Sequence, residues 1–330
     1  GAEIAKDPTE TLGDADIVLK VQPPSMEDGV DEISLLKPGT ILISNLGALS
    51  NKPLMEVLAK RGVTAFAVEL LPRITRAQAM DVLSSQSNLS GYKAVIDAAG
   101  ALGRIFPMMM TAAGTIAPAK VFIMGAGVAG LQAVATARRL GALVTATDVR
   151  PAAKEQVESL GARFIEVGPQ REEDVQTDGG YAKDIQPEYA EKQRLVVSEH
   201  IRKQDVVITT ALIPRRPAPK LITEEMVKNM PAGSVIVDLA VDAGGNCELF
   251  EFGKTVHKYG VTIIGHANVP SRIAEDASTL YAKNVLNFIT PLVDGQTNEL
   301  VIDWEDEIIQ GTLICRDGKT VHPALAGGEG

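Results

Sequence analysis

With 330 residues, the chain is longer than one ordinary hydrophobic core accommodates, which predicts two domains. Its hydrophobic content of 45% excludes a disordered chain, and its net charge of −10 disfavours nucleic acid and anionic membrane surfaces as partners. Cys247 and Cys315 lack metal-ligand spacing, so we expect reduced thiols and no metal site. No run of about 18 apolar residues occurs, so no membrane span is expected.

The first third of the chain alternates short β-rich runs with helical segments. The opening "GAEIA" lacks a Met and is interpreted as a strand already under way, and hence as a cut or processed end. Asn51 as N-cap and Gly62 as terminator predict a helix between two strands. One long helix is predicted over 78–104, ending before Pro107. Strands are predicted at 1–5, 15–21, 39–45 and 64–70.

A second, longer series has the same rhythm and predicts a parallel, doubly wound sheet of the α/β class. A long helix over 271–293 follows, and then two strand-like runs around Asp317-Gly318 predict a hairpin that is a candidate for dimer contacts. The strands of the series are predicted at 120–126, 143–149, 163–167, 205–211, 233–240 and 261–267.

These elements predict two Rossmann-like domains with a nucleotide cleft between them. Residues 1–83 and 290–330 would form one discontinuous domain, and 84–289 would form the dinucleotide-binding domain. The helices near 84–105 and 271–293 are expected to bridge the domains.

The strongest chemical motif is "GAGVAG", in which Gly125, Gly127 and Gly130 follow a strand and open a helix. This context predicts a dinucleotide site, with the pyrophosphate at the helix N-terminus. Asp148 ends the next strand, and its carboxylate can accept from both ribose hydroxyls and repel a 2′-phosphate, which predicts NAD(H). Arg150 is a complication, since a nearby arginine favours NADP(H). Three neighbours complete the candidate cofactor-binding set: Val128, Val149 and Ala211.

Two polar segments carry open alternatives. Residues 168–187 form a polar break in the rhythm, which is either a functional loop or a solvated one. In "PRITRAQAMDVLSSQS" (72–87), a helix would align Gln78, Asp81 and Ser84 on one face. Such a row of polar groups lines a site, or it simply caps a helix N-terminus.

Four segments together resemble the NAD(H)-binding component (domain I, α subunit) of proton-translocating NAD(P) transhydrogenase. The segments are "PRITRAQAMDVLSSQSNLSGYKAV", "GAGVAGLQA…ATDVR", "GGYAKDI" and "ITTALIPRRPAP…DLAVDAGGNCEL". The resemblance runs from residue 1 to the C-terminus, and the family's first strand–helix–strand has no counterpart ahead of "GAEIA".

The resemblance implies a Re/Si-specific enzyme in which hydride passes directly from NADH on this chain to NADP(H) on a partner domain. It also implies a membrane domain that translocates protons, a homodimer, and a peripheral location at the cytoplasmic or matrix face of the membrane. The family residues that line the nicotinamide map onto Arg73, Gln78, Asp81 and Ser84. The tyrosine of a loop that closes over the nucleotide maps onto Tyr181, which makes 168–187 a predicted lid. Such a reaction needs no general acid or base on this chain.

Two other functions stay open. Alanine dehydrogenases share the architecture and bind their substrate with a lysine and a histidine. Lys20 keeps the lysine's place in "LKVQPP", but the position of the histidine is Asn45, which argues against that activity. A nucleotide sensor without enzymatic activity is the third possibility.

Overall fold

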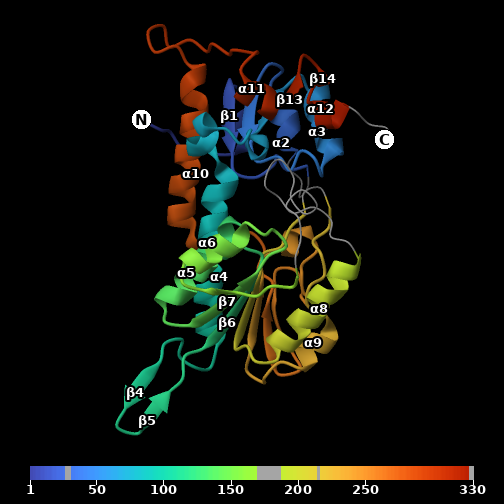
Figure 1. Cartoon of the computed structure of the whole chain (residues 1–330). Coiled ribbons are helices and arrows are strands. Elements are labelled where there is room, and N and C mark those ends of the chain that lie inside the picture. The colour runs from blue at the N-terminus through green and yellow to red at the C-terminus, as the bar shows by residue number, and fades with distance from the viewer. Residues whose placement is uncertain (27–30, 169–186, 214–215, 327–330) are drawn as a thin grey trace. The chain divides into compact units, whose positions relative to one another are not determined.

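The computed structural model describes residues 1–26, 31–168, 187–213 and 216–326 (Figure 1). The chain divides into two compact units, one formed by 1–85 and 278–330 and the other by 86–277. The chain passes from one unit to the other inside two helices, α4 (Val82–Ala101) and α10 (Ala274–Ile289). Each unit has its own sheet and its own core.

The sheet of the first unit is mixed, with the strand order β1-β2-β3-β13-β14. Strands β1 (Ile17–Lys20), β2 (Ile41–Ser44) and β3 (Thr64–Ala67) are parallel, as predicted. The hairpin around Asp317-Gly318 is confirmed: β13 (Leu313–Arg316) pairs antiparallel with both β3 and β14 (Lys319–Thr320). Asp317 and Gly318 have φ angles of 51° and 76°, the left-handed pair that a tight two-residue hairpin turn needs.

Helices cover both faces of this sheet because its central strands are apolar on both sides. Leu42 of β2 packs into one core cluster with Leu54 and Leu58, whereas Ile43 packs into another with Phe66 and Phe288. The helices of the unit besides α4 and α10 are α1 (Pro8–Leu12), α2 (Glu32–Leu35), α3 (Lys52–Lys60), η1 (Val68–Leu70), η2 (Thr75–Met80), η5 (Thr290–Leu292), α11 (Glu307–Thr312) and α12 (Pro323–Ala326).

Helix α3 begins and ends as its sequence predicts. The Asn51 side chain accepts from the backbone N–H of Leu54, and Gly62, with φ of 78°, lies beyond the last turn.

The second unit contains the doubly wound sheet, with the order β11-β12-β10-β9-β6-β7-β8. Six of the strands are parallel and coincide with the six predicted ones, which confirms the α/β class. The antiparallel edge strand β11 was not predicted, because "TVHK" is short and polar at alternate positions. The bounds are β6 (Lys120–Met124), β7 (Leu143–Thr147), β8 (Arg163–Phe164), β9 (Val206–Thr209), β10 (Val235–Asp238), β11 (Thr255–Lys258) and β12 (Val261–Ile264).

Side-chain alternation along β6 explains why helices lie on both faces of this sheet. Val121 and Ile123 pack into the core cluster that includes residues of α4, α5 (Val128–Arg139) and α6 (Ala153–Ser159). Phe122 and Met124 point the other way, into a cluster with residues of α8 (Pro187–Ile201) and α9 (Glu224–Lys228). The seven-stranded sheet is therefore buried between two helical layers, as parallel sheets are.

Three predictions about elements are wrong. Residues 1–5 have no regular secondary structure and join neither sheet. The helix predicted over 78–104 is two elements, η2 and α4, because Asp81 between them is extended (φ −71°, ψ 94°). The helix predicted over 271–293 is likewise broken into η4 (Val269–Ile273), α10 and η5, with Pro270 and Pro291 in the first turns of the two 3₁₀ segments.

A small hairpin of the second unit was also not predicted. Strands β4 (Met109–Thr111) and β5 (Gly114–Ile116) pair antiparallel and project from the rest of the unit. Over the part of the chain that the structure describes, no helix combines the length and the apolarity needed to cross a membrane.

Candidate nucleotide-binding site

The loops that follow the parallel strands of the second unit meet at the carboxyl edge of its sheet, which is where α/β sheets bind ligands. Gly125 follows β6, Asp148 follows β7, and Ala211 lies two residues beyond β9. The backbone N–H of Gly125 donates to the carbonyl of Thr147 (2.9 Å), so the structure brings the glycine motif and the end of β7 together.

Each glycine of the motif has a separate geometric reason. Gly125 has φ of 100°, and a Cβ there would lie 2.6 Å from Oγ1 of Thr210. A Cβ on Gly130 would lie 1.8 Å from the carbonyl oxygen of Gly125, so only glycine lets α5 pack this closely on the loop. Gly127 differs, because a Cβ there would meet nothing within 4 Å. The motif therefore combines two sites of close packing with one open side.

Gly127 is also the N-cap of α5, and among the described residues no side chain makes the capping hydrogen bond. Val128, the first residue of α5, is 40% exposed. The N-terminus of a 12-residue helix, bordered by an open glycine, suits an anionic ligand such as a pyrophosphate.

Asp148 connects the glycine loop to the end of β7. Its Oδ2 accepts from the backbone N–H of Ala126 (2.7 Å), and its Oδ1 accepts from the backbone N–H of Arg150 (2.9 Å). The Arg150 guanidinium also binds Asp148, so the two residues form an ion pair, with half-buried Val149 between them in the chain. The two charged residues that carry opposite predictions about the cofactor therefore interact directly.

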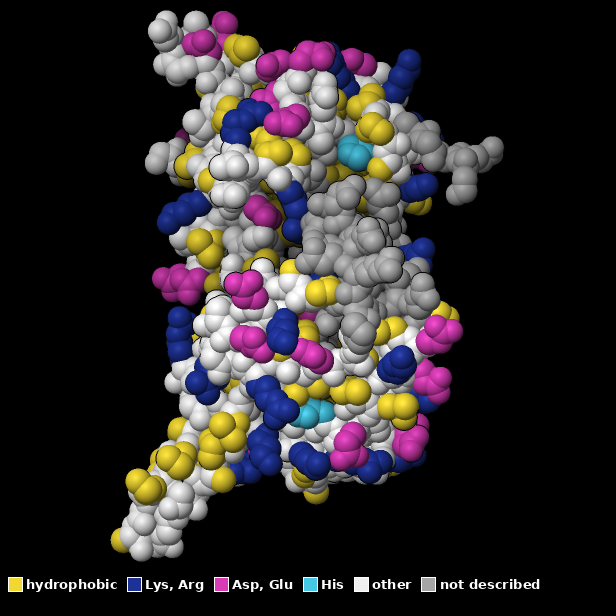
Figure 2. Space-filling view, viewed as in Figure 1, with side chains coloured by type: hydrophobic (Ala, Val, Ile, Leu, Met, Phe, Trp, Pro, Cys, Tyr) yellow, Lys and Arg dark blue, Asp and Glu magenta, His cyan; other side chains and the backbone are white. Residues whose placement is uncertain are grey.

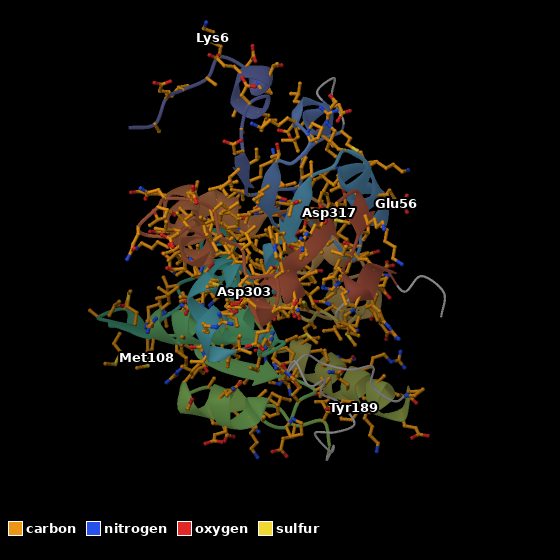
Figure 3. All side chains as sticks on the ribbon, turned by 90° about the horizontal axis from the view of Figure 1, so that it is seen from above. Lys6, Glu56, Met108, Tyr189, Asp303 and Asp317 are labelled. Carbon is orange, nitrogen blue, oxygen red and sulfur yellow. The ribbon has the colours of Figure 1, made fainter. Side chains whose placement is uncertain are left out.

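Tyr189, at the start of α8, is a further group near Asp148 that sequence reasoning did not single out (Figure 3). Burial, together with the negative charge of Asp148, raises the pKa of Tyr189 to about 12. The phenol is therefore protonated at neutral pH and available as a hydrogen-bond donor.

Asn246 is a positioning residue that the sequence analysis also missed. It is fully buried, and its side-chain amide both accepts from the backbone N–H of Ala211 (3.1 Å) and donates to the Ala211 carbonyl (2.9 Å). The buried carboxylate of Asp238 holds this loop in turn, because it accepts from the backbone N–H groups of Asn246 and Cys247 (2.7 and 2.9 Å). The only signal in the sequence is polar residues next to a buried strand.

In the first unit, Asp81 is the hinge of the segment that was predicted to line the nicotinamide. Its Oδ1 accepts from the backbone N–H of Ser84 (2.9 Å), and its Oδ2 accepts from Oγ of Ser84 (2.5 Å). This is an N-cap for α4, one of the two alternatives left open for this segment. Gln78 lies in η2 and is exposed, so Gln78, Asp81 and Ser84 are close in the chain but not on one helix face.

A buried amide on α10 fixes this segment. Asn284 donates to the carbonyl of Ala79 (2.9 Å) and accepts from Oγ of Ser85 (2.7 Å), so one side chain holds both sides of the Asp81 turn. It is 8% exposed on an otherwise apolar helix face. A polar residue at helical spacing among apolar ones is the signal that the sequence offered.

The remaining predicted site residues are placed only in part. Arg73 is exposed in the turn before η2, and its role at the site stays a prediction. Tyr181 and nearly all of the predicted lid over 168–187 lie outside the described residues. Among the residues that are described, no group of three His, Cys, Asp or Glu side chains could hold a metal ion.

The fold and the site together define a class. A parallel, doubly wound sheet with a glycine-rich first turn and an acidic residue after the second strand is a dinucleotide-binding Rossmann unit. Residues 1–90 match the N-terminal domain described as "Alanine dehydrogenase/PNT", and residues 94–323 match the C-terminal domain of that description. The chain belongs to the alanine dehydrogenase/PNT family, a family of oxidoreductases.

Individual relatives narrow this resemblance. The chain is 60% identical over 328 residues to the first of the chains that make up the NAD(P) transhydrogenase α subunit of Rhodospirillum rubrum, a match that covers 99% of this chain and 85% of the relative. A solved transhydrogenase from Sinorhizobium meliloti matches with a TM-score of 0.83 and 52% identity over 95% of this chain and 83% of that one. An L-alanine dehydrogenase structure has a TM-score of 0.75 at 23% identity over 98% and 83%, which shows a shared fold alone.

Proposed function

We propose that this chain is the NAD(H)-binding component of a proton-translocating, Re/Si-specific NAD(P) transhydrogenase. In this function, hydride passes directly from NADH bound here to NADP⁺ on a partner domain. The observation that carries the proposal is Asp148, a carboxylate held against the glycine loop in a chain that is 60% identical to a transhydrogenase α subunit.

The adenosine half of NADH is assigned to the second unit. The N-terminus of α5 and the open side of Gly127 receive the pyrophosphate. Asp148 accepts from the ribose hydroxyls, and its charge disfavours a 2′-phosphate, so NAD(H) is preferred over NADP(H). Ala211, clamped by Asn246, provides a rigid wall beside the glycine loop.

The nicotinamide half is assigned to the segment from Arg73 to Ser84. When bound, the nicotinamide ring supplies the hydride, and the side chains of this segment orient the ring and its carboxamide. Gln78 is exposed and offers an amide for this purpose, while Asp81 and Ser84 are fixed to one another. Tyr181 closes the site from the predicted lid and excludes water.

Two partners follow from this function: a domain that binds NADP(H) and a membrane domain that translocates protons. The chain would then be peripheral, at the cytoplasmic or matrix face of the membrane.

We also propose that the chain forms a homodimer through the β4–β5 hairpin. An isolated two-stranded hairpin is marginally stable in water, so this one calls for a cover. Met108, Met109, Met110 and Ile116 are 59, 45, 76 and 43% exposed on and beside it. Figure 2 shows these hydrophobic side chains gathered on the projecting hairpin, and Figure 3 labels Met108. The C-terminal hairpin is a weaker candidate, because β13 is already paired on both sides.

The alanine dehydrogenase alternative is disfavoured by the surroundings of Lys20. Its Nζ lies 2.7 and 2.8 Å from the two carboxylate oxygens of Glu32, so the lysine is already neutralised by a side chain of its own unit. Asn45, in place of a histidine, adds no general acid or base.

One set of assays separates the three functions. The proposal predicts NADH-dependent reduction of an NADP analogue that appears only when an NADP-binding transhydrogenase domain is added to this chain. Alanine-dependent formation of NADH would instead support an amino-acid dehydrogenase. NADH binding with neither activity would support a sensor.

A further inference from the structure

All the acceptor positions of Asp148 are occupied by donors of the second unit. Oδ1 accepts from the backbone N–H and from Nε of Arg150, both at 2.9 Å. Oδ2 accepts from the backbone N–H of Ala126 at 2.7 Å and from Nη2 of Arg150 at 2.9 Å. A carboxylate has about four acceptor positions, so any further donor must replace one of these four.

The four donors are not equivalent. The two backbone N–H groups belong to the loops after β6 and β7, and they fix the carboxylate in place. The Nε and Nη2 donors of Arg150 form a two-pronged fork that covers both oxygens at once. The two adjacent hydroxyls of a ribose need the same bidentate edge. A ribose and the Arg150 side chain therefore compete for Asp148.

The pair is strong enough for this competition to matter. The side chains of Arg150 and Asp148 are only 18% and 8% exposed, so solvent screens them weakly. The hydrogen bond to Asp148 raises the pKa of Arg150, although burial opposes the shift.

We propose that Arg150 is a specificity-determining residue for the nucleotide. Its guanidinium exchanges with the ribose diol of NADH on Asp148, and Asp148 in turn withholds this arginine from the 2′-phosphate of NADPH. The inference rests on the proposed function only in placing the adenosine ribose at Asp148. It assigns selectivity to the pair and not to the carboxylate alone.

The first test removes the competitor. In Arg150→Ala, the dissociation constant for NADH measured by calorimetry on the full chain should fall about three- to tenfold, because no side chain must be displaced. NADPH binding should not tighten, since the Asp148 charge is uncompensated. Arg150→Lys keeps the charge but not the fork, so its NADH affinity should lie between the other two, and this holds even if the alanine variant folds poorly.

Lys154→Ala is the matched control. It also removes one positive charge, but Lys154 is 47% exposed on α6 and pairs with Glu166. NADH affinity should stay at the wild-type value in this variant, which separates competition for Asp148 from a general change in charge.

The second test is a double-mutant cycle. Asp148→Ala frees Arg150, so NADPH should bind about tenfold more tightly than to wild type. The gain should vanish in Asp148→Ala/Arg150→Ala. Weaker NADH binding in Arg150→Ala, or a gain that persists in the double variant, would overturn the proposal. If wild type itself failed to bind NADH, the proposed function would fail instead.

Discussion

At the scale of single residues, the candidate site depends on polar side chains that are fixed by backbone groups. Asp148 is held by two backbone N–H groups, Asp238 by those of its own loop, and Asp81 by the first turn of α4. Groups held in this way lose little entropy when they orient a ligand, which suits a reaction whose catalyst supplies position and not acid–base chemistry. Gln78 is the exposed exception and is therefore the residue with the most direct role in alignment.

Gln78→Asn should slow hydride transfer at least tenfold while NADH affinity changes by less than about threefold, because a side chain shortened by one methylene misaligns the carboxamide. Stopped-flow transfer rates and calorimetric NADH titration measure the two quantities. Gln156→Asn, an exposed position on α6, is the control. An unchanged rate with a collapse of affinity would make Gln78 a binding residue only.

The residues that sequence reasoning identified are those whose motifs have fixed local geometry. Gly125, Gly130 and Asp148 could be predicted because strand, turn and helix follow each other within one βα unit. Asn246 and Asn284 could not, because their partners lie 35 and 205 residues away in the chain. The ion pair of Arg150 with Asp148 is local, but its geometry depends on rotamers that no sequence pattern reports.

At the scale of elements, the apolar rhythm of the chain predicted the parallel strands well, and it missed breaks caused by single residues. Asp81 ends η2 and caps α4 because its side chain competes with the backbone for N–H groups. The β4–β5 hairpin was missed because its residues are almost entirely exposed, so no alternation marks it. Elements without a buried face leave little signal in a sequence.

Asn284→Ala should destabilise the first unit by about 1–2 kcal/mol and slow hydride transfer, because the buried hydroxyl of Ser85 loses its partner and the Asp81 turn loosens. Urea unfolding and the transfer assay measure these effects. Asn287→Ala is the control, since this exposed neighbour donates only to Ala79. Equal losses in the two variants would contradict the positioning role of Asn284.

Helix α8 provides a prediction about pH. Burial, with the nearby charges of Arg163 and Lys203, lowers the pKa of His200, whose Nε2 lies 2.8 Å from Oγ1 of Thr145 in β7. The unfolded chain therefore binds a proton more readily than the folded one. The stability that the neutral ring contributes is complete above its unfolded pKa of about 6.5 and is lost as the pH falls below it.

The urea midpoint should accordingly fall between about pH 7.5 and about pH 5.5, and it should fall less in His200→Gln. Equal decreases in both proteins would show that His200 does not contribute to this pH dependence.

At the scale of the whole molecule, the proposed function is that of a nucleotide-binding component that acts with partners. Its own residues bind and orient NADH, and the acceptor belongs to another domain. The chain spans 85% of the R. rubrum relative, so the comparison extends over most of that protein.

The homodimer can be tested separately from catalysis. Analytical ultracentrifugation of wild type should show a dimer, and Met110→Glu should show a monomer, because a charge would be buried in the apolar contact of β4–β5. Leu195→Glu, at a 62% exposed position on α8, should stay dimeric. A dimeric Met110→Glu would place the interface elsewhere.

Direct transfer of a labelled hydride tests the central claim most directly. NADH carrying deuterium at the transferred position of C4 is mixed with this chain, an NADP-binding transhydrogenase domain and an NADP analogue. We predict that the deuterium appears on the reduced analogue and none in water, and that no product forms when this chain is omitted. Loss of the label to solvent, or formation of product without this chain, would contradict direct transfer from NADH bound here.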